Sequence, residues 1–219
     1  LRINSPGGGV APTQEIYQEI LKQRSEGMVV VTSMSSVAAS GGYYIASASD
    51  RIVANPGTIT GSIGVIMIFP SFEKLFEKIG IKSEVVKSGK FKDIGSPMKH
   101  LSDEDRQFIQ ALIDDVYDQF LEAVAQGRKL DRGELKKIAN GGIYSGRQAL
   151  ELGLVDKLGN LDDALDEAAK LAKIEGKPKV IMGRPPRGLF YWLFKGSYMG
   201  GLKDRIGGGY TGLQYIWGY

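Results

Sequence analysis

The chain of 219 residues contains no cysteine and one histidine, His100. Without cysteine it can form no disulfide framework and can use no thiolate as nucleophile or metal ligand. One histidine leaves no histidine-rich metal site, and any serine hydrolase chemistry must depend on His100 or on a different base. We therefore expect neither a metal centre nor a cofactor.

Long apolar runs are also absent. No stretch reaches the roughly 18 to 20 residues of a membrane-spanning helix, and no secretory signal begins the chain. The first residues, Leu1–Asn4, have the character of a strand that ends in a glycine turn. We therefore expect that an N-terminal part of the fold, with any membrane anchor, precedes this sequence.

The chain also lacks a large excess of positive or negative charge. The formal net charge is only +3, and basic residues are interleaved with acidic ones, so no nucleic-acid-binding stripe is indicated. The hydrophobic content of 42% is enough for a full core. We predict one α/β domain over residues 1–182 and a glycine- and aromatic-rich extension over residues 183–219.

The predicted domain alternates short apolar runs with helical patterns, which is typical of a parallel-rich sheet covered by helices. We predict strands over 28–32, 51–54, 63–68 and 83–87, and helices over 13–26, 40–50, 71–79, 102–126, 148–152 and 161–171. The apolar faces of four of these helices are predicted to be buried: Ile16, Ile20 and Leu21; Phe72, Leu75 and Phe76; Phe108, Leu112, Ile113, Val116, Phe120 and Val124; Leu165, Ala168 and Ala172.

The stretch Val37–Tyr44 places Ser40 where a buried strand turns into a helix. Unpaired N–H groups at the start of a helix can stabilise a nearby oxyanion, so Ser40 is a candidate nucleophile. The alternative is that its small neighbours only let the helix pack closely on the sheet. This stretch alone does not decide between the two.

Two further stretches supply complementary groups. The glycine turn Gly7–Gly9 follows the first strand and exposes backbone N–H groups without side chains, which suits an oxyanion hole or simply a tight turn. The loop Ser88–Asp93 carries lysines, and a lysine can activate a serine when burial removes its proton. The glycine spacing matches neither a Walker loop nor a dinucleotide fingerprint.

Four motifs, in order, resemble those of the signal peptide peptidase A family of serine proteases. They are Asn4–Gly8, Ala38–Tyr44, Thr60–Gly64 and Ser88–Asp93. The resemblance extends to about Ala172 and leaves the C-terminal extension uncovered. It implies a crotonase-like or Clp-protease-like α/β fold and hydrolysis of peptide bonds without a cofactor.

The resemblance also implies a role for individual residues. Ser40 matches the nucleophile and Lys92 the general base of a Ser-Lys dyad, while Ser62 matches the residue that orients the lysine. The N–H groups of Gly7 and Gly41 match the oxyanion hole. Family members form dome-shaped rings in which serine and lysine can come from different protomers, and they cleave remnant signal peptides outside the cytoplasmic membrane.

The neighbours of Lys92 raise competing interpretations. Lys90 is a second lysine in the loop, and the family pattern assigns it to solvent. Asp93 would keep the amine of Lys92 protonated if it faced that amine, so we predict that it points away. His100 precedes a helix-capping sequence and is predicted to lie at the surface.

Two rival functions remain. An acyl-CoA hydratase or hydrolase of the same fold would share the glycine turn but use carboxylates, and a non-catalytic ring would bind peptides without the dyad. The extension over residues 183–219 is predicted to be a partly ordered tail or a strand against a neighbouring subunit, rather than a segment that contacts a membrane. Its glycine content also allows it to enter the chain's own groove.

Overall fold

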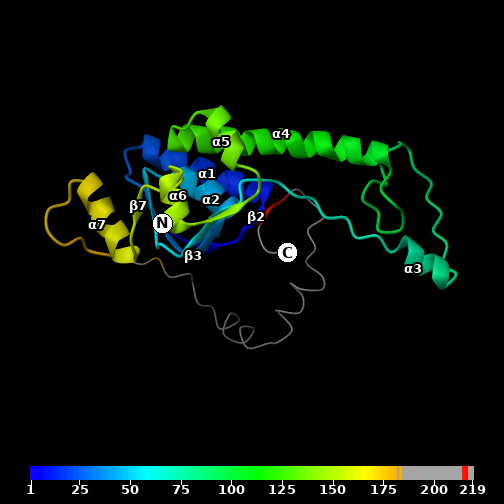
Figure 1. Ribbon diagram of the computed structural model, residues 1–219, viewed down its shortest axis with the longest axis horizontal. Helices are drawn as coiled ribbons and strands as arrows, with labels where there is room; N and C mark the ends of the chain where they lie inside the picture. Colours follow the sequence, from blue (N-terminus) through cyan, green and yellow to red (C-terminus); the bar gives the residue numbers. More distant parts are fainter. Residues whose placement is uncertain (182, 184–213, 217–219) are drawn as a thin grey trace.

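A computed structural model describes residues 1–181, 183 and 214–216 (Figure 1). The strands are β1 (Arg2–Ser5), β2 (Gly7–Gly9), β3 (Val31–Ala39), β4 (Arg51–Ala54), β5 (Ile59–Gly61), β6 (Ile143–Ser145), β7 (Lys157–Leu158) and β8 (Gln214–Ile216). The helices are α1 (Val10–Ser25), α2 (Gly41–Ser47), α3 (Glu73–Lys78), α4 (Asp103–Arg128), α5 (Arg132–Ile138), α6 (Gly146–Glu151) and α7 (Leu161–Leu171). The predicted boundary after residue 182 falls next to residues outside this description.

The predicted α/β architecture, with a parallel-rich sheet and surrounding helices, is confirmed. The main sheet has six strands, five of them in the order β6-β5-β3-β4-β7, with β1 on the other edge of β3. Only the β5–β6 pair in this sheet is antiparallel. Strands β2 and β8 form a separate two-stranded sheet beside it.

The central strand β3 differs from the predicted strand over 28–32. It begins at Val31 and continues through Ala39, because its first half pairs with β4 and its second half with β5. The helix predicted over 40–50 starts one residue after Ser40, at Gly41. Ser40 is therefore the single residue that joins the longest strand to a helix.

Helix caps agree closely with the sequence. Ser102 caps α4 through a capping box with Asp105, and Asn160 caps α7 in the same way with Asp163. These side chains satisfy N–H groups that have no partner within the helix, which fixes where the helices begin. Helix α1, in contrast, begins at Val10 without a side-chain cap, three residues before the predicted start.

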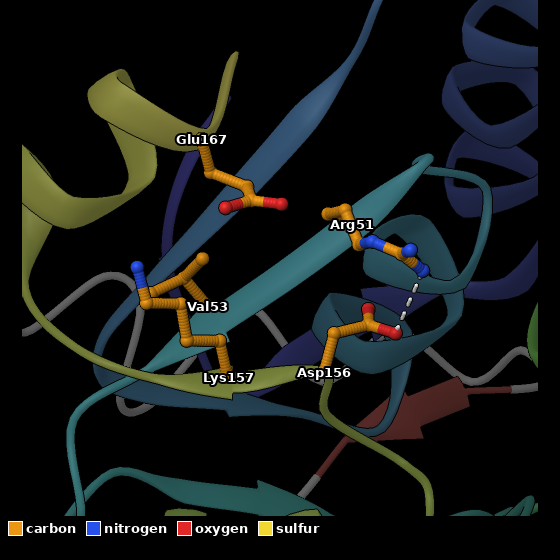
Figure 2. A pocket seen from close by; sticks show the side chains of 5 residues that line it. All are labelled: Arg51, Val53, Asp156, Lys157 and Glu167. Atoms are coloured by element: carbon orange, nitrogen blue, oxygen red, sulfur yellow. Dashed lines mark hydrogen bonds and ion pairs between the residues drawn. The ribbon is translucent and has the colours of Figure 1, made fainter. Parts of the chain in front are cut away.

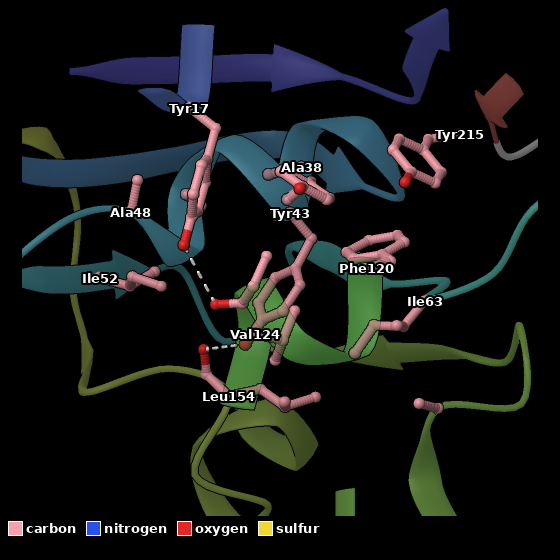
Figure 3. Packing of buried hydrophobic residues seen from close by; sticks show 14 of the residues in the cluster. Tyr17, Ala38, Tyr43, Ala48, Ile52, Ile63, Phe120, Val124, Leu154 and Tyr215 are labelled. Carbon is pink, nitrogen blue, oxygen red and sulfur yellow. Dashed lines mark hydrogen bonds between the residues drawn. The ribbon is translucent and has the colours of Figure 1, made fainter. Parts of the chain in front are cut away.

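The core lies between α1, α2 and α4 and the sheet (Figure 3). Tyr43 is fully buried on α2 and donates a hydrogen bond to the carbonyl of Leu154 (2.9 Å). Phe120 from α4 is also fully buried. Predicted faces are only partly right, because Ile16 is 48% exposed and α3 has no buried residue. Helix α7 buries Ala164 and Ala169, while the predicted Ala168 is only partly buried.

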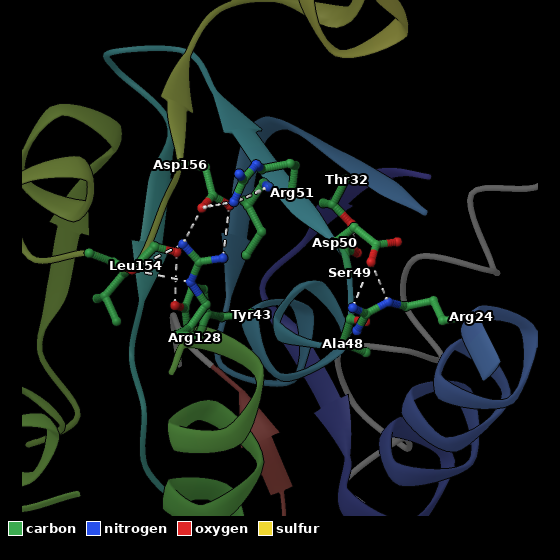
Figure 4. A network of polar contacts seen from close by, with 12 residues as sticks. Arg24, Thr32, Tyr43, Ala48, Ser49, Asp50, Arg51, Arg128, Leu154 and Asp156 are labelled. Atoms are coloured by element: carbon green, nitrogen blue, oxygen red, sulfur yellow. Dashed lines mark hydrogen bonds and ion pairs between the residues drawn. The ribbon is translucent and has the colours of Figure 1, made fainter. Parts of the chain in front are cut away.

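A network of polar contacts ties the end of α4 to the sheet (Figure 4). The guanidinium of Arg128 donates two hydrogen bonds to the carboxylate of Asp156, at 2.8 and 2.9 Å. The same carboxylate accepts the N–H of Ile52 (2.7 Å). Burial is the largest single effect and would raise the pKa of Asp156, but the bonds and charge of Arg128, the N–H of Ile52 and the charge of Arg51 together lower that pKa.

Replacing Asp156 with alanine is expected to lower the free energy of unfolding at pH 7 by about 3 kcal/mol, because it leaves the buried Arg128 charge unpaired. The folded pKa lies below the unfolded value of about 4. The stabilisation is therefore present above pH 4 and is lost as the pH falls through the folded pKa. Urea titrations of both chains at pH 7 and at decreasing acidic pH values should show the difference shrinking.

Arg51→Ala is the control, since Arg51 is 50% exposed and lies 3.5 Å from the same carboxylate. We expect a change below about 1 kcal/mol for such an exposed pair. An Asp156→Ala chain as stable as the wild type at pH 7 would contradict the assignment of this network as a major support of the fold.

Residues 64–101 form an extension of the fold that we call the arm. It leaves the body after Ile63, passes through α3 and returns at the start of α4 (Figure 1). The strands predicted over 63–68 and 83–87 are wrong, since neither segment forms a strand. No residue of the arm is buried, and several of its large apolar side chains, Ile79 and Val86 among them, are exposed.

Candidate active site

Ser40 sits on a strained turn. Its φ and ψ are 53° and −117°, a positive-φ conformation that costs a residue with a side chain about 1 to 3 kcal/mol. Two hydrogen bonds hold it there: its N–H donates to the carbonyl of Gly61, and its carbonyl accepts the N–H of Tyr44, both at 2.8 Å. The strand on one side and the helix on the other thus impose the turn.

The Ser40 hydroxyl has no partner. The residue is 1% exposed, and within the described part of the chain its Oγ is the one buried side-chain polar atom without a hydrogen bond. Buried hydroxyls are nearly always paired, because an unpaired one costs stability. A strained and unpaired hydroxyl at this point is typical of a group held ready for a reaction.

The glycine turn lies against the start of α2. A Cβ on Gly41 would come within 3.2 Å of the N atom of Gly8 and within 2.9 Å of the Thr13 hydroxyl, so only glycine fits. Gly7 has a φ of 121°, and its N–H donates to the hydroxyl of Ser5 at 3.2 Å. The structure therefore brings β2 and the first turn of α2 together at Ser40.

Ser62 is also near this turn. It follows Gly61, whose carbonyl accepts the Ser40 N–H, and it is buried with a φ of 49°. Its own N–H donates to the carbonyl of Gly142 (2.7 Å). Ser40, Ser62 and the glycine turn thus form one cluster at the ends of β3, β5 and β1.

Lys92 does not join this cluster. It is exposed in the arm, in a turn where its N–H donates to the carbonyl of Gly89 (3.1 Å). Its neighbour Phe91 stacks on Phe108 of α4, with ring centroids 4.5 Å apart. The lysine loop is thus held at the first turns of α4.

The length of α4 separates the lysine loop, Ser88–Asp93, from the Ser40 cluster. Phe108 contacts the lysine loop, whereas Phe120 packs on Tyr44, one helical turn after Ser40, with ring centroids 4.9 Å apart. The twelve-residue step from Phe108 to Phe120 spans about 18 Å along a helix axis. The side chain of Lys92 does not bridge that separation within one chain.

The other candidates in the arm behave as predicted. The carboxylate of Asp93 faces Lys87 and Lys99, at 2.6 and 3.0 Å, rather than Lys92. Hydrogen bonds from Lys87 and then Lys99 lower the pKa of Asp93 to about 2. Lys90 pairs with Glu104, and His100 is exposed. None of these groups lies at the Ser40 turn.

An aromatic pocket beside the cluster was not predicted. Tyr44 stacks on Tyr215 of β8, with centroids 5.2 Å apart at 20°, and Phe120 lies 4.6 Å from the same ring. The sequence motif contains Tyr44, but nothing in its pattern distinguishes a pocket wall from an ordinary core residue.

Another hollow, of about 310 Å³, lies between β4, β7 and α7 (Figure 2). Arg51, Asp156, Lys157 and Glu167 line it together with Val53. It holds none of the predicted site residues. Within the described ranges no group of histidine, aspartate and glutamate side chains is arranged to hold a metal, and no helix there has the length and apolar character needed to cross a bilayer.

Comparison with known proteins adds independent information. The model of peptidase family S49 matches residues 22–175. The chain is 51% identical over 175 residues to slr0021, an inferred protease of Synechocystis sp., 43% identical over 174 residues to an inferred signal peptide peptidase SppA of Enterococcus faecium, and 42% identical over 175 residues to Protease 4 of Salmonella typhi. Each match covers 80% of the chain, but 63%, 51% and 28% of the respective relative.

Proposed function

The chain belongs to peptidase family S49, and we propose that it is a serine endopeptidase with Ser40 as nucleophile and Lys92 as general base. Membership of this family agrees with the predicted resemblance to signal peptide peptidase A and with the α/β fold. The observation that carries the proposal is the Ser40 hydroxyl, which is buried, strained and unpaired.

The chemistry follows from the cluster. The Ser40 Oγ attacks the peptide carbonyl, and its proton passes to a neutral lysine amine. The resulting oxyanion is stabilised by the N–H of Gly41 and by that of Gly7, which exchanges its bond to Ser5 for the oxyanion. The tetrahedral species collapses to an ester on Ser40 while the lysine returns the proton to the departing amine, and water then hydrolyses the ester with the lysine as base.

The base is proposed to come from a second copy of the chain. Lys92 is held near the start of α4, far from Ser40, and the Ser40 hydroxyl has no hydrogen-bond partner that could act as its base. The arm that carries Lys92 exposes nine large apolar side chains: Ile66, Ile68, Phe72, Leu75, Ile79, Ile81, Val85, Val86 and Met98. Such a surface favours association, and Ser62 would orient the incoming amine.

We propose that copies of the chain form a ring. If each arm reaches the Ser40 cluster of the next copy, the contact is head to tail, and repeated head-to-tail contacts close into a ring when the rotation allows it. The buried, largely apolar surroundings of Ser40 would favour loss of the proton from an amine that enters them. Oligomerisation would then be part of catalysis.

The proposed substrates are hydrophobic peptides, in particular signal peptides after their release. The relative named as a signal peptide peptidase supports this. We place the catalytic domain on the extracytoplasmic side of the cell membrane, attached through a segment outside this sequence, because that is what the family resemblance implies.

The two rival functions, an acyl-CoA hydratase or hydrolase and a non-catalytic peptide-binding ring, explain fewer features of the Ser40 turn. An acyl-CoA hydratase of this fold needs a carboxylate at the glycine turn, and the only buried acid among the described residues is Asp105, at the start of α4. A non-catalytic peptide-binding ring gives no reason for the strain and unpaired hydroxyl of Ser40. Both features cost stability and are explained by nucleophilic chemistry.

The test uses a fluorophosphonate probe and quenched peptides of apolar sequence. We expect the probe to form one adduct per chain, which peptide mapping by mass spectrometry places on Ser40, and we expect the labelled protein to hydrolyse no peptide. An adduct on another serine, or hydrolysis that survives full labelling of Ser40, would overturn the proposal.

A further inference from the structure

The lysine loop, Ser88–Asp93, is closed by a side chain that comes just before it. The ammonium of Lys87 donates hydrogen bonds to the carbonyl of Lys90 (2.9 Å) and to the carboxylate of Asp93 (2.6 Å). The side chain of Asp93 is only 13% exposed. Lys87 therefore ties together the turn that carries Lys92.

A second lysine joins the same carboxylate to α4. Lys99 donates to Asp93 (3.0 Å) and to Asp105 in the first turn of α4 (3.2 Å). Asp105 is buried and also accepts the N–H of Ser102, the cap of this helix, at 3.1 Å. Two lysines and two carboxylates thus alternate in a charge chain that fixes the loop on the start of α4: Lys87, Asp93, Lys99 and Asp105.

Lys92 is left out of this pairing. Its neighbour Lys90 pairs with the carboxylate of Glu104, and Lys87 and Lys99 belong to the charge chain. A carboxylate beside an ammonium makes it hold its proton more strongly. Among the residues that the structure describes, Lys92 is therefore the one of these four lysines whose charged form no ion pair stabilises.

The direction of the Asp93 carboxylate decides its effect on Lys92. The two residues are adjacent, and an opposite charge within about 4 to 6 Å shifts a pKa by about 1 to 3 pH units. The hydrogen bonds from Lys87 and then Lys99 lower the pKa of Asp93 to about 2, so Asp93 is ionised wherever a lysine could act as base. Its charge stays away from the amine of Lys92 only if other groups hold the carboxylate in another direction.

We propose that Lys87 and Lys99 are positioning residues, which hold the Asp93 carboxylate away from the proposed base. The amine of Lys92 can then lose its proton when it meets Ser40. This inference rests on the proposed peptidase function. The contacts of Lys87 across the turn and of Lys99 with α4 support it, because together they fix where the carboxylate points.

The other acids near the loop are also bound. Glu104 and Asp105 are the carboxylates that α4 presents to the arm, and they pair with Lys90 and Lys99. At the Ser40 cluster, the described residues contribute no buried acid. Asp93 is therefore the carboxylate whose release would change the pKa of the Lys92 amine.

The test measures the pH dependence of kcat/KM on quenched apolar peptides. With a lysine as base, the rate rises with pH through the pKa of its amine. We expect the chain with Lys87→Met and Lys99→Met to reach its half-maximal rate about one pH unit higher than the wild type, because Asp93 can then approach Lys92. At a fixed pH below both midpoints, it should be about tenfold slower.

Two further chains separate charge from loop structure. Adding Asp93→Asn to the double variant should return the midpoint to that of the wild type, since the amide keeps the shape of the side chain without its charge. Lys74→Met with Lys78→Met removes two exposed cations from the same arm and should leave the midpoint unchanged. A double variant that titrates like the wild type, or a midpoint that Asp93→Asn does not restore, would overturn the inference.

A direct measurement covers variants that hydrolyse too slowly. Limiting acetic anhydride acetylates an amine in its neutral form, so the pH dependence of acetylation at Lys92, followed by mass spectrometry, reports the pKa of that amine. This pKa should rise in the double variant and fall back with Asp93→Asn, and an unchanged value would overturn the inference. Lys87→Met alone, which keeps the bond from Lys99, should shift it in the same direction by less.

Failure of the peptidase proposal has a different signature. A wild-type chain that hydrolyses no peptide, or a Lys92→Ala chain as active as the wild type, refutes the proposed base whatever the pKa of its amine. An active wild type and an inactive Lys92→Ala chain, combined with a midpoint that the double variant does not move, would leave the peptidase proposal standing and refute the role of Lys87 and Lys99.

Discussion

The Ser40→Ala chain is expected to hydrolyse quenched apolar peptides at least about 1,000-fold more slowly than the wild type, since loss of a catalytic nucleophile typically costs that much or more. The same chain should also show no labelling by a fluorophosphonate. The measurements are initial rates at saturating peptide and the mass of the labelled protein. If the Ser40→Ala chain still hydrolysed the peptides or still reacted with the fluorophosphonate, the nucleophile would be another residue.

The fold should tolerate this substitution. The Ser40 Oγ makes no hydrogen bond, so alanine removes a buried hydroxyl without leaving a partner unpaired, and we expect the free energy of unfolding to stay within about 1 kcal/mol of the wild type. Ser47→Ala is the matched control on the same helix. Ser47 is fully buried and donates to the carbonyl of Tyr44 (2.7 Å), so its loss should lower stability by about 1 kcal/mol and leave activity intact.

The contrast between these two serines shows what sequence reasoning could and could not supply. The pattern of Val37–Tyr44 was sufficient to single out Ser40 as a turn between strand and helix. It could not reveal that the Oγ lacks a partner, because that depends on β5 and on the glycine turn, which approach from distant parts of the sequence. Strain and unpaired groups are properties of the assembled fold.

Helix α4 shows the same limit over a longer distance. The sequence predicted its capping box and its apolar repeat correctly, since both are local. The repeat did not show that Val116, Phe120 and Val124 are buried in the body while Phe108 and Leu112 are 52% and 43% exposed. An apolar stripe has the same period whether it faces the core or a partner.

The arm is where the sequence-based interpretation failed most. Residues 63–68 and 83–87 have the apolar and β-branched composition of strands, yet among the described residues neither forms a strand, and the first has only a single bridge at Ile66. A strand needs pairing as well as composition. If the arm docks on a second copy, as proposed, the missing partner of these segments lies in that copy, and the failed prediction and the exposed apolar surface have one cause.

Mixing two inactive chains should restore activity. Ser40→Ala lacks the proposed nucleophile and Lys92→Ala lacks the proposed base, and each alone should be at least about 1,000-fold less active than the wild type. If every site takes its serine from one copy and its lysine from the next, a random one-to-one mixture has both groups intact in about a quarter of the sites. We expect about a quarter of the wild-type rate after the chains are exchanged in mild denaturant and reassembled.

The controls separate the sources of the lysine. Lys90→Ala removes the neighbouring lysine, which pairs with Glu104, and should be nearly as active as the wild type. A chain that carries both Ser40→Ala and Lys92→Ala, mixed with wild type, should give about a quarter of the sites intact as well, because only wild-type copies that meet each other contribute. A different result is expected if each site is built within one chain. The mixture of the two single variants then stays inactive, and the mixture of the double variant with wild type keeps about half of the wild-type rate. In that case the arm must fold back along α4 to bring Lys92 to Ser40.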